Sequence, residues 1–389
     1  MKRSTERILT THAGSLPRPE QLNVLYVKRA RGEALGPGEI AAAGLDALRA
    51  IVPKQVAAGI DVGNNGEQQH DSFFLYLKER LTGLGGTWQR ASRADVDRYP
   101  EFKQRYLEQT ASSATRVSPN DGLPTAIGEV RYIDAAAIES ECRDFAEVLK
   151  AHPQAFVEAF MNAPSPGMLA ATIKNRHYDS EAKYLRALGE ALRVEYEAIV
   201  GSGYVLQIDA PDLALERHIS FKDKPVSEFV GFVESVVATI NAALVNIAPD
   251  RVRLHVCWGN SESPHDADVP LANILPALRQ ANVGALYIPF AGPRHAHEFR
   301  CFEKLPLKSD QVLIAGVIDP LTNVIEHPEV VADRIERVAA AVGDPTVVLA
   351  ANDCGFATMA GWGRVTSDVA WAKLRSLSDG ARIASARLY

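Results

Sequence analysis

Short apolar runs alternate along this chain with longer segments in which apolar residues recur every three or four positions. The runs lie near residues 8–13, 60–66, 155–161, 204–209, 252–257, 284–290, 311–318 and 346–353. Each run has the length of a buried strand, and the segments between them have the period of helices that cover a sheet. Eight strands that alternate with helices predict an α/β fold, a closed (β/α)8 or TIM barrel.

One region departs from this alternation. Residues 86–150 run through GGTWQRASRADVDRYPEF, one extra strand in PTAIGEVRYID, and a helix in AIESECRDFAEVLKA. This region has too few apolar residues for a core of its own. We therefore expect a single catalytic-barrel domain over residues 1–389, with 86–150 as an insertion between the second and third barrel strands.

Composition limits the classes of function. With 47% hydrophobic and 23% charged residues, the chain is typical of a globular protein, and its net charge of −6 argues against nucleic-acid binding. The first residues, MKRSTERILTTHAGSLPRP, are too polar for a signal peptide, and no stretch of about 18 uncharged apolar residues occurs. We expect a cytoplasmic protein with no membrane or nucleic-acid partner. The sequence leaves open whether the protein forms a homo-oligomer.

The four cysteines are too few for a disulfide framework in so long a chain. Cys142 and Cys301 fall on helical segments, and we interpret both as small core residues. His255 and Cys257 stand two positions apart at the end of the run RVRLHVC, so on a strand both side chains point to one face. Cys354 directly follows the eighth run.

Functional side chains of TIM barrels lie at the carboxyl ends of the strands. Several runs end in polar residues, namely His12 and Ser15, Glu67, Asp209 and Asp212, His255 and Cys257, and Asp353 with Cys354. His255, Cys257 and Cys354 would then meet at the barrel mouth, where thiolate and imidazole ligands suit zinc. The spacing alone leaves a metal site and ordinary core cysteines equally open.

The motifs THAGSLPRP, QIDAPDLAL, LHVCWGN with PHDADVPLANILP, AGPRHAHEF and NDCGF occur in this order between the first run and the C-terminus. Together they resemble the catalytic barrel of the cobalamin-independent methionine synthase family, especially its single-barrel members. That family shares its fold with uroporphyrinogen decarboxylase and includes epoxyalkane:coenzyme M transferase. The resemblance implies a zinc ion that binds a substrate thiol and activates it for alkylation.

The resemblance also implies roles for individual residues. It assigns the zinc ligands to His255, Cys257 and Cys354, and it places Ser15 near the carboxylate and Glu67 and Asp209 near the ammonium of an amino-acid thiol. The residue types agree, because a zinc-bound thiol is deprotonated at neutral pH and carboxylates bind ammonium by charge-assisted hydrogen bonds. For Glu67 and Asp209 the alternative is helix capping or solvation of the barrel mouth.

This chain departs from the family at the metal site. Many relatives have a glutamate ligand at the end of the sixth strand, where this sequence has Pro289. Three protein ligands still suffice for a catalytic zinc ion. His295, His297 and Glu298 follow nearby and are candidates to replace the glutamate, although a position facing solvent or a partner is the simpler expectation.

A second departure concerns the alkyl donor. Methionine synthases have a histidine after the seventh strand that acts as acid for the folate leaving group, and Leu321 occupies that position here. Asp319 and Asp353 are the candidate acids. Without the histidine, protonation of a poor amine leaving group is less well supported.

The first expectation is therefore a zinc-dependent transferase in methionine biosynthesis, which methylates homocysteine from 5-methyltetrahydropteroyltriglutamate. A near alternative is thiol addition to an epoxide, as in epoxyalkane:coenzyme M transferase, or the reverse carbon–sulfur lyase reaction. Glu67 and Asp209 favour a thiol with an ammonium group over a sulfonate. An alternative of another class is a metal-free lyase or decarboxylase-like barrel, or a metabolite-binding one. The insertion and GWGRV, residues 361–365, are candidate lids.

Overall fold

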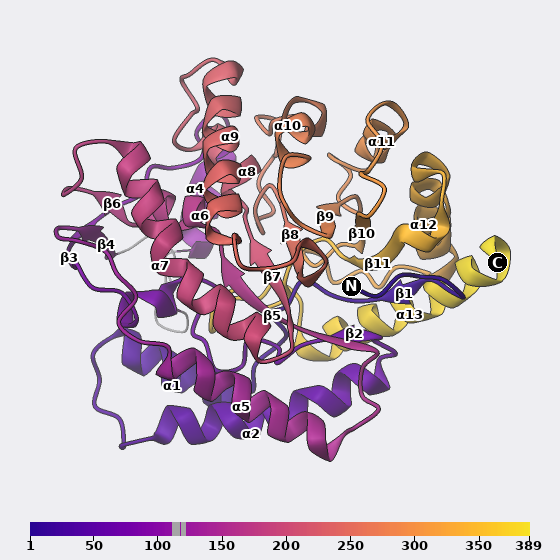
Figure 1. Cartoon of the computed structure of the whole chain (residues 1–389), viewed down its shortest axis with the longest axis horizontal. Coiled ribbons are helices and arrows are strands. Elements are labelled where there is room, and N and C mark those ends of the chain that lie inside the picture. The colour runs from indigo at the N-terminus through magenta and orange to yellow at the C-terminus, as the bar shows by residue number, and fades with distance from the viewer. Residues whose placement is uncertain (111–116, 118–121) are drawn as a thin grey trace.

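An eight-stranded parallel sheet forms the centre of the protein, in the order β1-β11-β10-β9-β8-β7-β5-β2. The computed structural model describes residues 1–110, 117 and 122–389 (Figure 1). A bridge between Thr11 and Val62 joins the two edge strands and closes the sheet into a barrel. The predicted (β/α)8 fold is confirmed.

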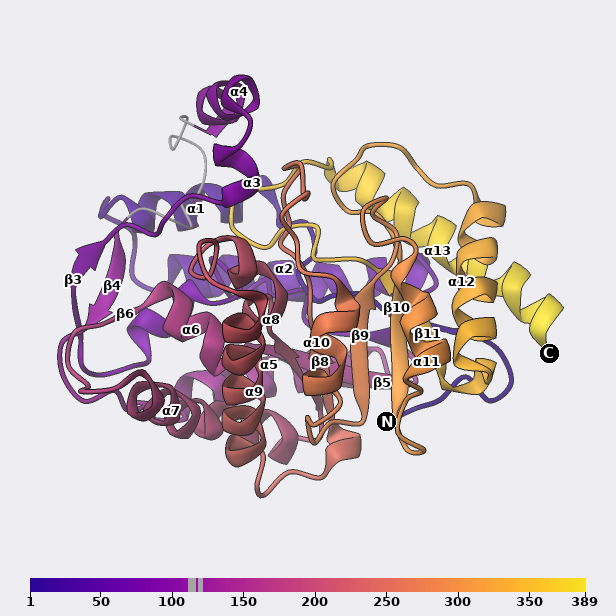
Figure 2. The same cartoon turned by 90° about the horizontal axis from the view of Figure 1, so that it is seen from above.

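Every barrel strand overlaps one of the predicted runs. The strands are β1 Leu9–Thr10, β2 Val62–Gly63, β5 Glu158–Pro164, β7 Val205–Asp209, β8 Val252–His255, β9 Ala285–Pro289, β10 Val312–Ile318 and β11 Val348–Asn352. The longer helices are α1 Glu20–Ala30, α2 Glu39–Ala57, α5 Ala136–Ala151, α7 Glu181–Gly201, α9 Val226–Ala243, α10 Leu271–Leu278, α12 Pro328–Val342 and α13 Ser367–Leu388. Figure 2 shows helices arranged around the strands, as the alternating pattern predicts.

The alternation along β8 explains how a site is built inside the barrel. Val252 and Leu254 point outward and belong to the large core between strands and helices. Arg253 and His255 point to the interior, because successive side chains on a strand face opposite sides. Outward apolar residues thus fix the register that turns the polar residues inward.

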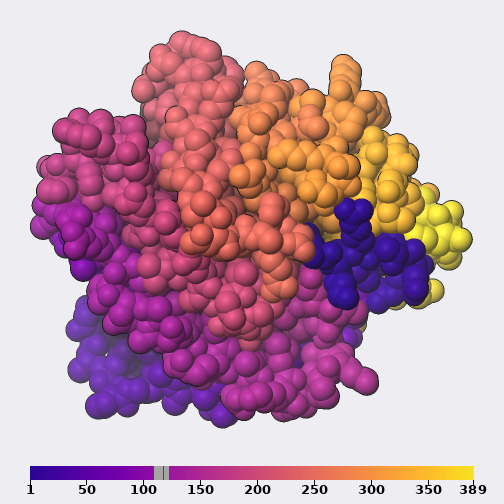
Figure 3. All heavy atoms as spheres, in the orientation of Figure 1, coloured from indigo at the N-terminus to yellow at the C-terminus, as the bar shows by residue number. Residues whose placement is uncertain are grey.

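The amino ends of the strands are closed by the N-terminal segment. Met1 packs against the apolar cluster inside the barrel. Ser4 is fully buried, and its backbone N–H donates to the carbonyl of Thr346 at 2.9 Å. Figure 3 shows this segment, in indigo, on the surface beside the yellow C-terminal helix. The opposite end of the barrel is left for the functional site.

The segment between β2 and β5 contains the predicted helix, α5, and more structure than the one strand predicted before it. It comprises η1 Leu75–Glu79, β3 Leu84–Trp88, α3 Ala94–Asp97, α4 Pro100–Thr110, β4 Leu123–Ala126 and α5. Strands β3 and β4 join β6, Lys174–Asn175, in a separate three-stranded sheet. The sequence LGGTW of β3 carries a weak strand signal, because glycine is depleted in strands. Residues 111–116 and 118–121 of the predicted insertion lie outside the described residues.

Short helices lie in the connections before and after the barrel strands. They are α6 Pro166–Thr172, α8 Asp212–Leu215, η3 Glu216–His218, η4 Pro249–Arg251, η5 Glu298–Arg300, α11 Cys301–Lys304 and η6 Pro345–Val347. In the described part of the chain, α9 is the one helix long and apolar enough to cross a membrane. It packs against α7 and α10, so its apolar residues are accounted for by the outer layer of the barrel.

Candidate functional site

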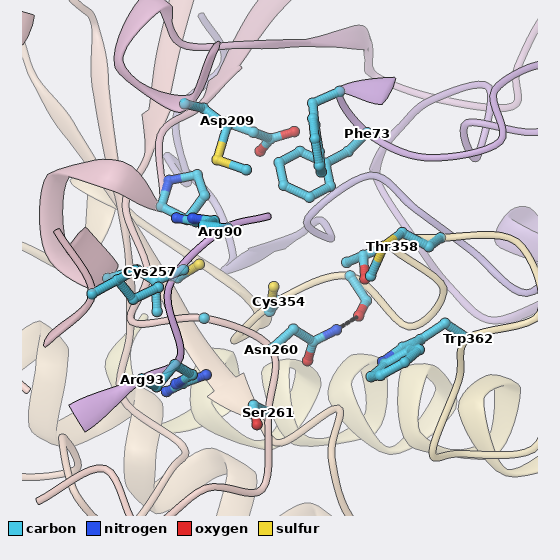
Figure 4. Close-up of a pocket in the computed structure, with 18 of the residues that line it drawn as sticks. Phe73, Arg90, Arg93, Asp209, Cys257, Asn260, Ser261, Cys354, Thr358 and Trp362 are labelled. Atoms are coloured by element: carbon cyan, nitrogen blue, oxygen red, sulfur yellow. Dashed lines mark hydrogen bonds between the residues drawn. The ribbon is translucent and has the colours of Figure 1, made fainter. Parts of the chain in front are cut away.

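A cavity of about 820 Å³ lies at the carboxyl ends of the barrel strands (Figure 4). The side chains predicted to form the site line it together, namely Ser15, Glu67, Asp209, His255, Cys257 and Cys354. They follow or end β1, β2, β7, β8 and β11. The closed barrel is what brings these distant positions of the sequence to one place.

His255, Cys257 and Cys354 form a potential metal-binding group. Their ligand atoms all lie within 4.8 Å of one another, and neither cysteine is in a disulfide. A hydrogen bond from Cys354, together with the charge of His255, lowers the pKa of the Cys257 thiol to about 6 despite its burial. One imidazole and two sulfur atoms at this separation are a donor set that suits a soft or borderline metal ion.

Asp209 holds the ring of His255. Its Oδ1 accepts a hydrogen bond from His255 Nδ1 at 2.9 Å, which leaves Nε2 3.2 Å from the main-chain oxygen of Asp353, beside Cys354. Burial lowers the pKa of His255, but the hydrogen bond to Asp209 and the nearby charges outweigh it, so the net shift is upward. Metal-binding histidines are commonly oriented by a carboxylate in this way.

A polar layer beneath the cavity orients Asp209 in turn. Gln207 Nε2 donates to Asp209 Oδ1 at 2.8 Å, and Asn162 Nδ2 donates to Oδ2 at 2.8 Å. Arg253 Nε donates to Gln207 Oε1 at 2.6 Å, so the amide can turn only its NH2 group toward Asp209. His12 lies apart from the cavity, where its Nε2 contacts Gln55 Oε1 at 2.8 Å and burial lowers its pKa to about 3.

Glu67 and Ser15 occupy another part of the cavity wall. Glu67 is 3% exposed, and its Oε2 has no hydrogen-bond partner among the described residues. Burial, followed by the charge of Asp209, raises the pKa of Glu67 to about 8. A Cβ atom on Gly355 would lie 1.9 Å from Ser15 Oγ, so the hydroxyl reaches its place only because residue 355 is glycine.

Comparison with known proteins gives whole-chain matches. No family model matches the sequence. A Bacillus subtilis protein named uncharacterized protein YxjH is 25% identical over 387 residues, covering 95% of this chain and 92% of its own length. A methionine synthase from Saccharolobus solfataricus is 23% identical over 384 residues, covering 96% and 94%. The predicted resemblance to the cobalamin-independent methionine synthase family is confirmed.

Solved structures agree with the methionine synthase resemblance at the level of the fold. A B12-independent methionine synthase from Shewanella sp. W3-18-1, in complex with selenomethionine, aligns with a TM-score of 0.73 and 20% identity, covering 98% of this chain and 99% of that one. A putative vitamin-B12 independent methionine synthase from Listeria monocytogenes aligns with a TM-score of 0.60 and 18% identity, covering 97% and 98%.

The resemblance predicts an additional metal ligand at the position of Pro289. Pro289 ends β9, and none of His295, His297 and Glu298 lines the cavity. His295 Nδ1 is 2.8 Å from Glu298 Oε2, and Glu298 Oε1 accepts from the backbone N–H of Leu271 at 2.7 Å. His297 is exposed.

The two candidate acids also lie outside the cavity lining. Asp353 accepts hydrogen bonds from the backbone N–H groups of Phe290, Ala291 and Gly292 at 2.8–3.1 Å, and burial raises its pKa to about 7 despite them. Asp319 Oδ1 accepts from the backbone N–H of Leu321 at 2.9 Å. Both carboxylates support loops beside the site.

Arg90 and Arg93 are two charged residues among those of the cavity lining that were not predicted. Both come from the insertion and lie near Cys257 in Figure 4. Arg90 pairs with Glu216, and Arg93 Nε contacts Asp95 at 3.3 Å, while Arg90 Nε has no hydrogen-bond partner in the described part of the chain. Burial and the charge of Arg93 lower the pKa of Arg90 to about 10. From the GWGRV segment, Trp362 also lines the cavity.

Proposed function

We propose that this protein is a zinc-dependent transferase that moves an alkyl group, methyl in the first instance, to the sulfur of homocysteine or a closely related amino-acid thiol. The observation that carries the proposal is the convergence of His255, Cys257 and Cys354 in one cavity with an unpaired buried carboxylate, Glu67. The names of the archaeal relatives agree with this activity.

His255, Cys257 and Cys354 would hold the zinc ion, and the fourth position would be open to the substrate. When bound, zinc supplies the Lewis acidity that keeps a thiol sulfur in its anionic form at neutral pH. Asp209 fixes the ring of His255 through Nδ1, so that Nε2 remains the ligand atom. Gln207, Asn162 and Arg253 keep Asp209 in place.

The rest of the cavity fits a zwitterionic thiol and an anionic second substrate. Glu67 has a free oxygen inside the protein, and a substrate ammonium would supply the missing donor and opposite charge. Ser15 offers a hydroxyl to the carboxylate. Arg90 and Arg93 line the cavity with cationic groups, which favours a donor that carries an anionic group beside them.

The possible alkyl donors differ in whether their leaving group must be protonated as it departs. Asp319 and Asp353 are engaged with loop amides outside the cavity, so neither is in position to protonate a departing amine. This favours a donor whose leaving group departs without a proton from either carboxylate, such as a sulfonium.

On this proposal the protein is a metabolic enzyme of the cytoplasm that takes two small-molecule substrates.

The test is zinc content and methionine formation in wild type, Cys354→Ser and Cys301→Ser. Cys301 is a cysteine outside the cavity lining and serves as the matched control. Wild type and Cys301→Ser should bind zinc in the cavity and form methionine from homocysteine. Cys354→Ser should lose that ion and the activity. Zinc content independent of Cys354, or no methylated thiol with either a methylated folate or a sulfonium donor, would reject the proposal.

A further inference from the structure

A second group of metal-binding side chains lies outside the cavity lining, between the loops that follow β8 and β9. His265 and Asp268 belong to the first loop and His295 to the second. Their ligand atoms all lie within 4.8 Å of one another. The alkyl transfer proposed above uses none of them.

Both histidines are oriented in the manner of metal ligands. His265 Nε2 lies 2.7 Å from the carbonyl oxygen of Ser261, and His295 Nδ1 lies 2.8 Å from Glu298 Oε2. Carbonyl and carboxylate oxygens only accept hydrogen bonds, so these outer nitrogens carry the ring protons. The inner nitrogens of both rings then face the same atom, Asp268 Oδ2, at 2.7 and 2.8 Å.

A third imidazole faces the same carboxylate. His218, from η3, is 1% exposed, and its Nδ1 lies 3.2 Å from Asp268 Oδ1 and 3.8 Å from Asp95 Oδ1. Neither ring nitrogen of His218, nor Asp268 Oδ1, has a hydrogen-bond partner among the residues described. Buried polar atoms are nearly always satisfied, so the unpaired oxygen of Asp268 indicates a missing partner at the cluster.

Charge decides what that partner can be. Without a metal ion, the inner nitrogens of His265 and His295 each need a second proton to face Asp268, and two imidazolium groups would then share one carboxylate oxygen. Glu298 and Asp95 are the other acidic groups at the cluster, and Asp95 is already paired with Arg93.

We propose that His265, Asp268 and His295 bind a divalent transition-metal ion, with zinc as the first candidate. Two neutral imidazoles and one carboxylate are a donor set that such ions favour, and three protein ligands suffice for zinc. Ligands on one ion stand roughly 3 Å or more apart, so Asp268 Oδ2 must move a few tenths of an ångström on binding.

The ion would fix one wall of the cavity. Asp95 Oδ2 accepts from the backbone N–H of His265 at 3.1 Å, and this contact connects the cluster to the insertion. Arg93 and Val96, on either side of Asp95, line the cavity. The metal would therefore link the insertion to the loops after β8 and β9, a structural role separate from the chemistry at Cys257.

Zinc titration of the Cys257→Ser/Cys354→Ser protein tests this site by itself. After treatment with a chelator, the protein is titrated with Zn²⁺ in a calorimeter, and circular dichroism establishes that it is folded. We expect one zinc ion per chain, no binding after adding His265→Asn, and 10- to 100-fold weaker binding after adding Glu298→Gln, which removes the carboxylate that orients His295. The exposed His177→Asn is the matched control and should change nothing.

If the Cys257→Ser/Cys354→Ser variant is folded and binds no zinc, the proposal is overturned, because hydrogen bonds alone would then hold the cluster together. Zinc binding that is the same with and without Glu298→Gln would also overturn it, and this variant decides the matter if His265→Asn does not fold. Because two of the three cavity ligands, Cys257 and Cys354, are replaced in the protein titrated, the result does not depend on the proposed function. Loss of the cavity site alone would leave one zinc ion per chain.

Discussion

The substitution Asp209→Asn tests the support of the proposed metal ligand. The carboxylate accepts hydrogen bonds from His255 Nδ1 at 2.9 Å, Gln207 Nε2 at 2.8 Å and Asn162 Nδ2 at 2.8 Å. An asparagine offers one oxygen and one NH2 group in the same space. At least one of the three donors would then face another donor, and the His255 ring would lose its charged partner.

The size of the effect follows from these contacts. A hydrogen bond to a charged group contributes about 1.5–3 kcal/mol, and loss of the partner of a metal-binding histidine weakens metal affinity about 10- to 100-fold. We expect the zinc dissociation constant to rise by that factor, which corresponds to about 1.4–2.7 kcal/mol. The assay is competition between the metal-free protein and a chromogenic chelator, with urea unfolding of the metal-free protein measured in parallel.

Asp61→Asn is the control for a carboxylate lost elsewhere in the barrel. Asp61 accepts from Arg7 and Thr10 at the amino ends of the strands, away from the cavity. This variant should lose stability but keep the zinc affinity of the wild type within about twofold, because the groups that orient His255 are left intact. Equal zinc affinity in Asp209→Asn and Asp61→Asn would refute the reasoning, since Asp209 would then stabilise only the fold.

Three further outcomes follow from the structure. Glu67→Gln should raise KM about tenfold or more for thiols that carry an ammonium group and little for 3-mercaptopropionate; equal changes would contradict an ammonium site. Gly355→Ala should cost about 1–3 kcal/mol through its clash with Ser15, and Gly355→Ala/Ser15→Ala should recover most of that stability; no recovery would place the strain elsewhere. The hydrogen bond from Lys103 lowers the pKa of Asp97 to about 2, so its stabilisation is present above the ordinary pKa near 3.8 and is lost as pH falls toward 2. Asp97→Asn should therefore cost about 1 kcal/mol at pH 7 and almost nothing at pH 2 in urea unfolding; a cost independent of pH would exclude the charge as its source.

The period of the apolar residues was sufficient to predict the barrel. The polar residues at the ends of the predicted strands were sufficient to predict where the cavity lies. His255 and Cys257 share a face because they are two apart on or just after β8, which is a local property of the sequence. Cys354 joins them through barrel closure, a long-range property that the eight-run pattern already contained. For this reason the fold and the group of three possible ligands could be predicted together.

The polar layer and the insertion could not be predicted in the same way. Arg253 sits in an apolar run, and nothing local indicates that its guanidinium group lies in the barrel interior against Gln207. Arg90 and Arg93 enter the cavity because of how the insertion folds over the strand ends, which no periodicity encodes. The partner of Asp209 was equally hidden, because the contact with His255 joins strands β7 and β8 across 46 positions of sequence.

The possible metal ligands and the arginines of the cavity come from two different parts of the chain, the barrel and the insertion between β2 and β5. The possible ligands lie at the end of β8 and just after β8 and β11, whereas Arg90 and Arg93 come from a segment that is not part of the barrel sheet. On the proposed function, exchange of that segment would change which second substrate is admitted and leave the strands with the possible ligands unchanged. The same separation makes residues 86–110 the place to introduce a different specificity into this barrel.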